Sequence, residues 1–308
     1  MKRLIYILVF VMVGVGASAQ QEAMISQYMF NGLMLNPAYA GSHDYFSTSV
    51  LHRSQWVQFD NAPVTQVFSI DGPIADDRLG IGLNVVNDRL GIVNQLDIGA
   101  NIAVKFPLES GTLSFGLRAD VVSYSARLSD VIVQDVADPV YSFNDIQGQF
   151  ATQFAFGAYY HADNWYAGLG IPNLYSLDDN ISVYDNPEST GYFVPHYFVN
   201  GGMVFSPSFN LDIKPSILVK IEPAAPVEID LNCNFLLYKR LWLGAGYRTG
   251  DALVGILEYQ LTPQLRAGYA YDWTLTDISD YSKGSHEVMI GYDFGKDIAI
   301  KKRSPRYF

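Results

Sequence analysis

Hydrophobic and polar residues alternate with a period of two along most of the chain after residue 41. In the clearest segment, residues 227–235, every odd-numbered residue from Val227 to Phe235 is apolar, and every even-numbered residue is Glu, Asp or Asn. Successive side chains of a β-strand point to opposite faces, so this period is typical of strands with one apolar and one polar face. The chain is therefore predicted to be an all-β protein.

The same pattern predicts fourteen strands, of which the first, second and twelfth alternate least clearly. An even number suits a bacterial outer-membrane barrel, in which a tilted strand of about ten residues crosses the bilayer. The predicted strands lie near residues 43–58, 63–71, 78–87, 95–107, 111–128, 149–161, 165–172, 196–206, 210–221, 226–237, 241–248, 252–261, 264–273 and 285–294.

The turn at residues 222–226 links two of these strands and predicts how they pair. If the strands fold back on one another about Ala224, Lys220 lies opposite Glu228 on the polar face. A cross-strand pair of opposite charge would help to set the register of the two strands.

A soluble β-sandwich also alternates, with its apolar face buried, so two further features are needed to separate it from a membrane barrel. The polar face carries many Gly and charged residues, whereas the apolar face carries aliphatic residues flanked by aromatic ones. The connections also alternate in length, as in a barrel with short periplasmic turns and long outer loops. The long connections are 129–148, 174–195 and 274–284, and the short ones are 108–110, 162–164, 207–209, 238–240 and 262–263.

We therefore expect a single-domain, closed antiparallel transmembrane β-barrel over residues 43–294, embedded in outer-membrane lipid. Its long loops are expected to be extracellular and both of its termini periplasmic. The loops are rich in Asp, and we expect a solvated acidic rim there; Ca²⁺ binding is the alternative, although the spacing of an EF-hand is absent.

The N-terminal residues resemble a signal peptide over residues 1–19. Two basic residues precede an apolar run at 4–15, and Ala17-Ser18-Ala19 has the small-residue pattern of a cleavage site. The next segment, 20–42, is apolar and is expected to lie either in the periplasm or in the lumen, where the polar-face glycines leave room for a plug. The tail, 295–308, carries five basic residues and one acidic residue. We expect it to be periplasmic, either docked on an acidic partner or disordered.

Charge and chemical motifs exclude several classes of function. Removal of residues 1–19 leaves 18 basic and 31 acidic residues, a net charge of −13, which repels nucleic acid. The single cysteine, Cys233, excludes an intrachain disulfide and falls on the apolar face. The five histidines have no metal-ligand spacing, and the motifs of hydrolases and nucleotide-binding proteins are absent. We therefore expect no catalytic, cofactor-binding or metal-binding residues, with a hydrolase using His196 or His286 at the barrel rim as an alternative.

Residues 27–42, which read Gln-Tyr-Met-Phe-Asn-Gly-Leu-Met-Leu-Asn-Pro-Ala-Tyr-Ala-Gly-Ser, resemble the opening signature of the PorP/SprF family. Segments 53–56, 62–65, 80–82 and 88–91 are also similar to it, and Asn-Pro-Ala-Tyr-Ala-Gly is the distinctive run. Gly32 departs from the Pro that we expect in many members. The motif positions with an expected structural or partner-binding role are Asn36, Pro37, Ala38, Tyr39, Gly41, Arg53, Gln55 and Trp56.

The resemblance implies a non-enzymatic outer-membrane barrel of the type IX secretion and gliding motility system of the Bacteroidota. Such a barrel helps to secrete a large surface adhesin, or holds it on the cell through the adhesin's C-terminal domain. Other outer-membrane or periplasmic type IX components are further candidate partners, and a passive porin is the alternative function.

The motif residues also carry physical expectations of their own. The Asn36-Pro37 pair favours an extended or turn conformation, and Gly41 permits a sharp bend before the first strand. Arg53 and Trp56 are expected on opposite faces of that strand, with Arg53 in contact with acidic side chains of the lumen.

Overall fold

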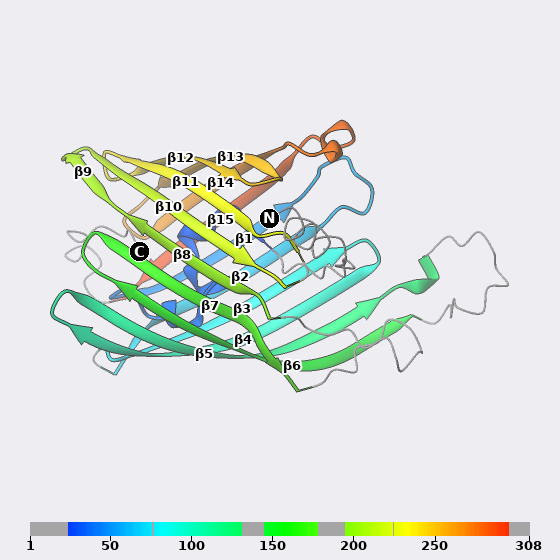
Figure 1. Cartoon of the computed structure of the whole chain (residues 1–308), viewed down its shortest axis with the longest axis horizontal. Coiled ribbons are helices and arrows are strands. Elements are labelled where there is room, and N and C mark those ends of the chain that lie inside the picture. The colour runs from blue at the N-terminus through cyan, green and yellow to red at the C-terminus, as the bar shows by residue number, and fades with distance from the viewer. Residues whose placement is uncertain (1–23, 76, 131–144, 178–194, 224, 296–308) are drawn as a thin grey trace, which may run out of the picture.

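The computed structural model describes residues 24–75, 77–130, 145–177, 195–223 and 225–295, which form one closed antiparallel sheet (Figure 1). Each strand pairs with the next along the chain, except that β8 and β9 both pair with β10, and β15 pairs with β1 to close the barrel. The strands are β1 (Phe46–Ser54), β2 (Val64–Ile74), β3 (Leu79–Leu90), β4 (Val93–Leu108), β5 (Gly111–Ala126), β6 (Ile146–His161), β7 (Trp165–Ser176), β8 (Tyr197–Met203), β9 (Phe205–Ser208), β10 (Leu211–Ile221), β11 (Glu228–Leu237), β12 (Leu241–Arg248), β13 (Ala252–Gln260), β14 (Leu265–Thr274) and β15 (Ser285–Phe294).

The short strands β8 and β9 are two halves of one wall strand. Both pair with β10, and only Val204 separates them. The backbone N–H of Val204 donates instead to the carbonyl of Asn164, at 2.8 Å, in the turn between β6 and β7. The wall therefore has the fourteen strand positions that the alternation predicts.

Burial along the strands is inverted relative to a soluble protein. On β5, Leu117 and Val121 are 58% and 51% exposed, whereas the neighbouring Arg118 and Asp120 are buried. A sandwich would bury the aliphatic face, because apolar area removed from water stabilises by about 25 cal/mol per Å². An outward aliphatic band with a polar interior is instead the arrangement of a barrel in lipid. No helix among the described residues is long and apolar enough to span a membrane.

The predicted register of β10 and β11 is confirmed. Lys220 lies opposite Glu228, and the two side chains form an ion pair. Cys233 lies on the outward face of β11, in line with the exposed Leu231 and Phe235.

The connections divide between two ends of the barrel (Figure 1). Tight turns at one end, which we call the short-turn end, join β2 to β3, β4 to β5, β6 to β7, β9 to β10, β11 to β12 and β13 to β14. The remaining connections, among them those from β5 to β6, β7 to β8 and β14 to β15, join strand ends at the opposite, long-loop end, and the last of these contains the 3₁₀ turn η5 (Asp277–Asp280). Strand β15 ends at the short-turn end, where Phe294 pairs with Phe46 at the start of β1.

The first strand is shorter than the sequence predicts. The ladder between β1 and β2 ends at Ser54 and Val64, and the N–H of Gln55 closes it on the carbonyl of Pro63, at 3.0 Å. Trp56 has a φ of +46°, which turns the backbone out of the sheet. The placement of Trp56 on the first strand, opposite Arg53, was therefore wrong.

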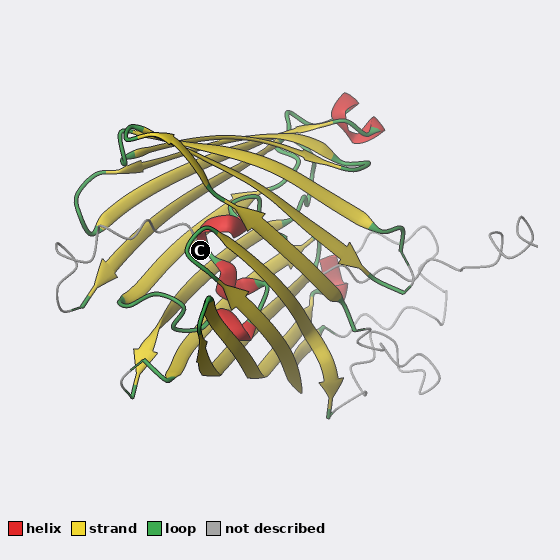
Figure 2. Cartoon of the chain, turned by 60° about the vertical axis from the view of Figure 1, so that its left-hand side comes forward, coloured by secondary structure: helices red, strands yellow, loops and turns green. Residues whose placement is uncertain are grey.

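Residues 24–42 lie inside the barrel and form three short 3₁₀ turns, η1 (Tyr28–Phe30), η2 (Gly32–Met34) and η3 (Pro37–Tyr39) (Figure 2). Most of their side chains are buried, with Ile25, Gln27, Leu33 and Ala38 at 0–1% exposure. The predicted signal peptide at 1–19 and all but the first residue of the basic tail at 295–308 lie outside the described residues.

Candidate functional site: a lumen crossed by the N-terminal segment

The N-terminal segment, residues 24–42, crosses the lumen from one end to the other. Ser26 contacts Asp272 and Glu287, which lie close to the long-loop ends of β14 and β15. Gly41 contacts Asp71 and Lys105, which lie near the short-turn ends of β2 and β4. The first described residues thus lie at the long-loop end, and the two termini, which are expected to be periplasmic, lie outside the described residues.

Glu287 holds the start of the segment through its backbone. Its two carboxylate oxygens accept hydrogen bonds from the N–H groups of Ser26 and Gln27, each at 2.8 Å. The hydroxyl of Ser26 donates to the carboxylate of Asp272, also at 2.8 Å. Hydrogen bonds to an ionised acceptor are roughly twice as strong as neutral ones, so this is a firm attachment.

Arginine side chains neutralise these buried carboxylates. Arg53 Nη2 lies 2.7 Å from Asp272, and Arg53 Nη1 lies 3.3 Å from Glu287. Arg248 adds a contact of 3.4 Å to Asp272. Buried charges need such partners, because an unpaired ion in the interior is costly. We call Ser26, Arg53, Asp272 and Glu287 the clasp; the expected contact of Arg53 with lumen acids is present in it.

Polar residues of the wall bind the middle of the segment. Asn232 Nδ2 donates to the hydroxyl of Tyr28 at 2.7 Å, and Asn84 Nδ2 donates to the carbonyl of Leu33 at 3.3 Å. The segment is therefore hydrogen-bonded to the polar inner face of the barrel along its length.

Glycines on the inner wall leave the room that the segment occupies. A Cβ atom on Gly80 would lie 1.8 Å from the carbonyl oxygen of Ala40, and one on Gly170 would lie 2.0 Å from that of Leu35. A Cβ on Gly116 would come within 2.3 Å of the backbone nitrogen of Ala38. These distances are far below van der Waals contact, so any side chain at these positions would displace the segment.

The Asn-Pro-Ala-Tyr-Ala-Gly run forms the part of the segment nearest the short-turn end. Asn36 caps η3 by accepting the N–H of Ala38 at 2.9 Å, and its amide donates to the carbonyl of Ala158 at 2.9 Å. Pro37 occupies the first helical position, where a missing N–H costs nothing.

Tyr39 and Gly41 complete this run. The ring of Tyr39 packs edge-on against Tyr159, with ring centroids 5.5 Å apart. Gly41 has a φ of +66°, its N–H donates to Asp71 at 2.9 Å, and its carbonyl accepts Lys105 Nζ at 2.6 Å. The structure thus places Asn36 to Tyr39 at η3 and Gly41 just after it. Arg53 lies in the clasp, and Gln55 and Trp56 lie in the connection between β1 and β2.

Several residues of this site were missed by the sequence analysis. Arg248, Asp272 and Glu287 gave only one signal in the sequence, which was a polar residue on the polar face near a strand end, and Ser26, in the N-terminal segment, gave none. That signal is shared by many lumenal positions, so it did not single them out.

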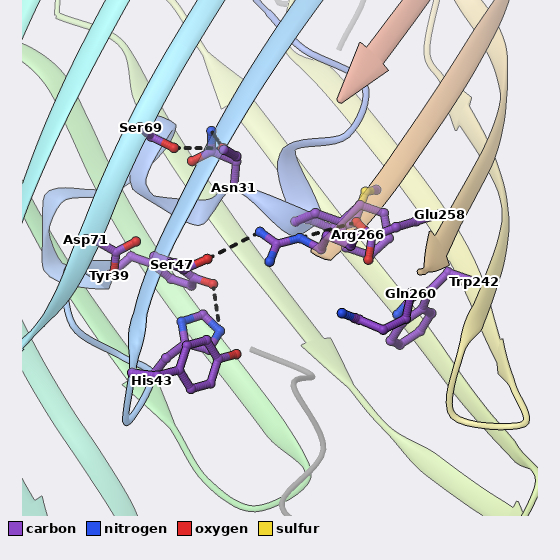
Figure 3. A pocket seen from close by; sticks show the side chains of 14 residues that line it. Asn31, Tyr39, His43, Ser47, Ser69, Asp71, Trp242, Glu258, Gln260 and Arg266 are labelled. Atoms are coloured by element: carbon purple, nitrogen blue, oxygen red, sulfur yellow. Dashed lines mark hydrogen bonds and ion pairs between the residues drawn. The ribbon is translucent and has the colours of Figure 1, made fainter. Parts of the chain in front are cut away.

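A cavity of about 60 Å³ remains at the short-turn end, between the segment and the wall (Figure 3). Its lining includes the carboxylates of Asp71 and Glu258 and the guanidinium of Arg266. Arg266 lies 2.7 Å from Asp293, outside the lining, and 3.7 Å from Glu258. Its Nη2 also donates to the hydroxyl of Ser47 at 3.3 Å. In the described part of the chain, no group of three or more His, Cys, Asp or Glu side chains is placed to hold a metal ion.

The two histidines of the hydrolase alternative face different environments. His286 Nδ1 lies 2.6 Å from the hydroxyl of Tyr269, in an exposed contact. His196 is buried and lies 3.4 Å from Glu222. The structure does not bring these two histidines together into one site.

Comparison with known proteins identifies a family. A family model described as the type IX secretion system membrane protein PorP/SprF matches residues 17–292. Curated protein sequences give no match.

Solved outer-membrane proteins are similar to the chain in structure. Omp33 of Acinetobacter baumannii has a TM-score of 0.47 and 11% identity over 82% of this chain and 98% of that one. The CymD monoaromatic hydrocarbon channel has a TM-score of 0.46 and 11% identity over 91% and 93%. Outer membrane phospholipase A from Escherichia coli has a TM-score of 0.40 and 12% identity over 89% and 99%.

Proposed function

Because the chain belongs to the PorP/SprF family of type IX secretion membrane proteins, we propose that it binds a secreted protein and does not conduct solutes. The partner that we propose is a type IX surface adhesin, which the barrel helps to secrete or holds on the cell through the adhesin's C-terminal domain. The long loops would face the partner outside the cell, and the carboxyl end of β15 would face the periplasm and other components of the system.

One observation supports this proposal most strongly, namely that the lumen is crossed by the chain's own N-terminal segment. The clasp holds one end of that segment and the Asp71 and Lys105 contacts hold the other. A diffusion porin needs an open, water-filled lumen. A barrel filled in this way retains its rims and loops as binding surfaces.

Gene deletion tests the role in secretion. We expect the cognate adhesin to disappear from the cell surface, as measured by antibody labelling of intact cells, and to return when the wild-type gene is restored. Total adhesin in the culture distinguishes a defect in export, where it accumulates in cells, from a defect in attachment, where it is found in the medium. Unchanged display on the surface of the deletion strain would refute the proposal.

Reconstitution in planar bilayers tests the porin alternative. We expect the full chain to be silent or to conduct rarely, whereas steady, large conductance would favour the porin. The rim hydrolase is tested separately, because it requires an activity that is lost in His196→Ala or His286→Ala. We propose that no such activity exists.

A further inference from the structure

A second cavity, of about 50 Å³, lies at the long-loop end of the lumen. It is bounded by Met24 at the start of the N-terminal segment, by His196 and Phe198 at the start of β8, and by the connection between β10 and β11. No residue of the clasp lines it, and the proposed function does not depend on it.

Two side chains that line this cavity, His196 and Glu222, carry buried polar atoms that have no hydrogen-bond partner in the described part of the chain. The side chains of His196 and Glu222 are each 9% exposed, and His196 Nε2 lies 3.4 Å from Glu222 Oε2. Among the described residues, neither imidazole nitrogen of His196 has a hydrogen-bond partner, and neither does Glu222 Oε1. Buried polar atoms in native proteins are almost always paired with protein, water or ligand, so these atoms mark a place where a donor binds.

The charge of the cavity favours a cation. Lys220 is paired with Glu228 and lies 3.6 Å from Asp230, so its charge is already balanced. Glu222 has no lysine or arginine within ion-pair distance in the described part of the chain. An incoming cation would therefore complete an ion pair with Glu222, rather than compete with one.

The other lining residues are the Lys220–Glu228 ion pair and four apolar residues. The apolar residues are Met24, Phe198, Ala225 and Pro226. A ligand that fits must therefore combine a hydrophobic stem with a cationic head that donates hydrogen bonds. Lysine and arginine side chains have this character, because their methylene stems bury against apolar surface while their heads remain charged.

We propose that this cavity binds a lysine or arginine side chain of an extracellular polypeptide. Its ammonium or guanidinium group donates to Glu222 Oε1 and to an imidazole nitrogen of His196, and its stem packs between Met24 and Phe198. This inference rests on the proposed function in one respect, since the secreted partner is the polypeptide that would supply the side chain.

The binding chemistry can be tested on the full chain in detergent, with n-butylammonium as the probe. Methionine methyl groups are labelled with ¹³C, and the Met24 signal is assigned by its loss in Met24→Leu. We expect a saturable shift of that signal with n-butylammonium and none with n-butanol. Glu222→Gln should weaken binding about tenfold, because the ammonium group then donates to a neutral amide oxygen instead of a carboxylate. Asp277→Asn, in η5 at the same end of the barrel, should leave binding unchanged.

Three results would overturn the inference. Equal shifts with butanol and butylammonium would indicate a site that does not select a cation, and the absence of a saturable shift would indicate water alone. A response that appears only after residues 20–23 are deleted would assign the cavity to the chain's own amino end. Heat-modifiable mobility on gels confirms in each case that the variant barrel is folded.

A cellular measurement separates this inference from the proposed function. If Glu222→Gln reduces adhesin on the cell surface as gene deletion does, both stand. If deletion removes the adhesin but Glu222→Gln does not, the cavity is not the docking point and the proposed function survives. If deletion has no effect, the proposed function fails, and the butylammonium titration alone decides the chemistry of the cavity.

Discussion

Glu287→Gln is the substitution that most directly probes how the N-terminal segment is held. The carboxylate of Glu287 accepts two backbone hydrogen bonds, from Ser26 and Gln27, and lies 3.3 Å from Arg53. Glutamine keeps the shape of the side chain but has one acceptor oxygen, and its amide N–H₂ would face a backbone N–H. One charge-assisted hydrogen bond is then lost and a buried donor is left unpaired, at a cost of about 3 kcal/mol.

This cost should appear as local opening, not as unfolding of the barrel. A loss of about 3 kcal/mol increases the open population of the first residues roughly a hundredfold. Hydrogen exchange measured by mass spectrometry should therefore show that peptides covering residues 24–30 lose about two orders of magnitude of protection. Peptides covering 36–42 should keep theirs, because Asn36 and Gly41 are held by separate bonds.

Glu228→Gln is the matched control for this experiment. Glu228 is also a glutamate of the lumen at the long-loop end, but its ion-pair partners are Lys220 and Arg248 of the wall. We expect it to leave the exchange of residues 24–30 unchanged. The account of the clasp is wrong if Glu287→Gln exchanges like the wild-type protein, or if both variants open the segment equally.

Three further predictions concern the wall, the clasp and the motif. Gly170→Ala should displace the segment and produce measurable conductance in planar bilayers, because its Cβ would lie 2.0 Å from a backbone oxygen, whereas Gly255→Ala, where the nearest atom is 4.0 Å away, should stay silent. Arg53→Ala should lower stability by about 3–5 kcal/mol, since it leaves the carboxylates of the clasp short of a cation; a barrel that melts at the wild-type temperature on heat-modifiability gels would contradict this. Asn36→Ala should cost about 1 kcal/mol through the lost cap of η3 and more through the bond to Ala158, and urea titration of the folded band measures the sum.

Local sequence patterns were sufficient to predict most of the fold, and the register of β10 and β11 shows why. Lys220 and Glu228 are eight residues apart and joined by one short connection, so symmetry about that connection sufficed to pair them. The first strand shows the limit of the same reasoning. Nothing in the alternation near Trp56 marks the point at which the chain leaves the sheet, because Pro63, just before the neighbouring strand, and the positive φ of Trp56 decide it.

Less of the site than of the fold could be predicted from the sequence. The apolar character of segment 20–42 and the glycines of the polar face left a lumenal plug open as one of two alternatives. The partners of that plug were not visible, because Ser26 and Glu287 are 261 residues apart in the chain. No pattern of period two relates residues so distant.

The sequence by itself determined the strands, their number and the opposite character of their two faces, because each depends on neighbours within a few residues. Only the tertiary structure decided that the N-terminal segment crosses the lumen and begins at the long-loop end. Closure of the barrel brings β14 and β15 beside β1, and only then do two carboxylates and an arginine meet around the backbone of Ser26. The physical reason is that alternation is a local property, whereas the clasp exists only when both ends of the chain are in place.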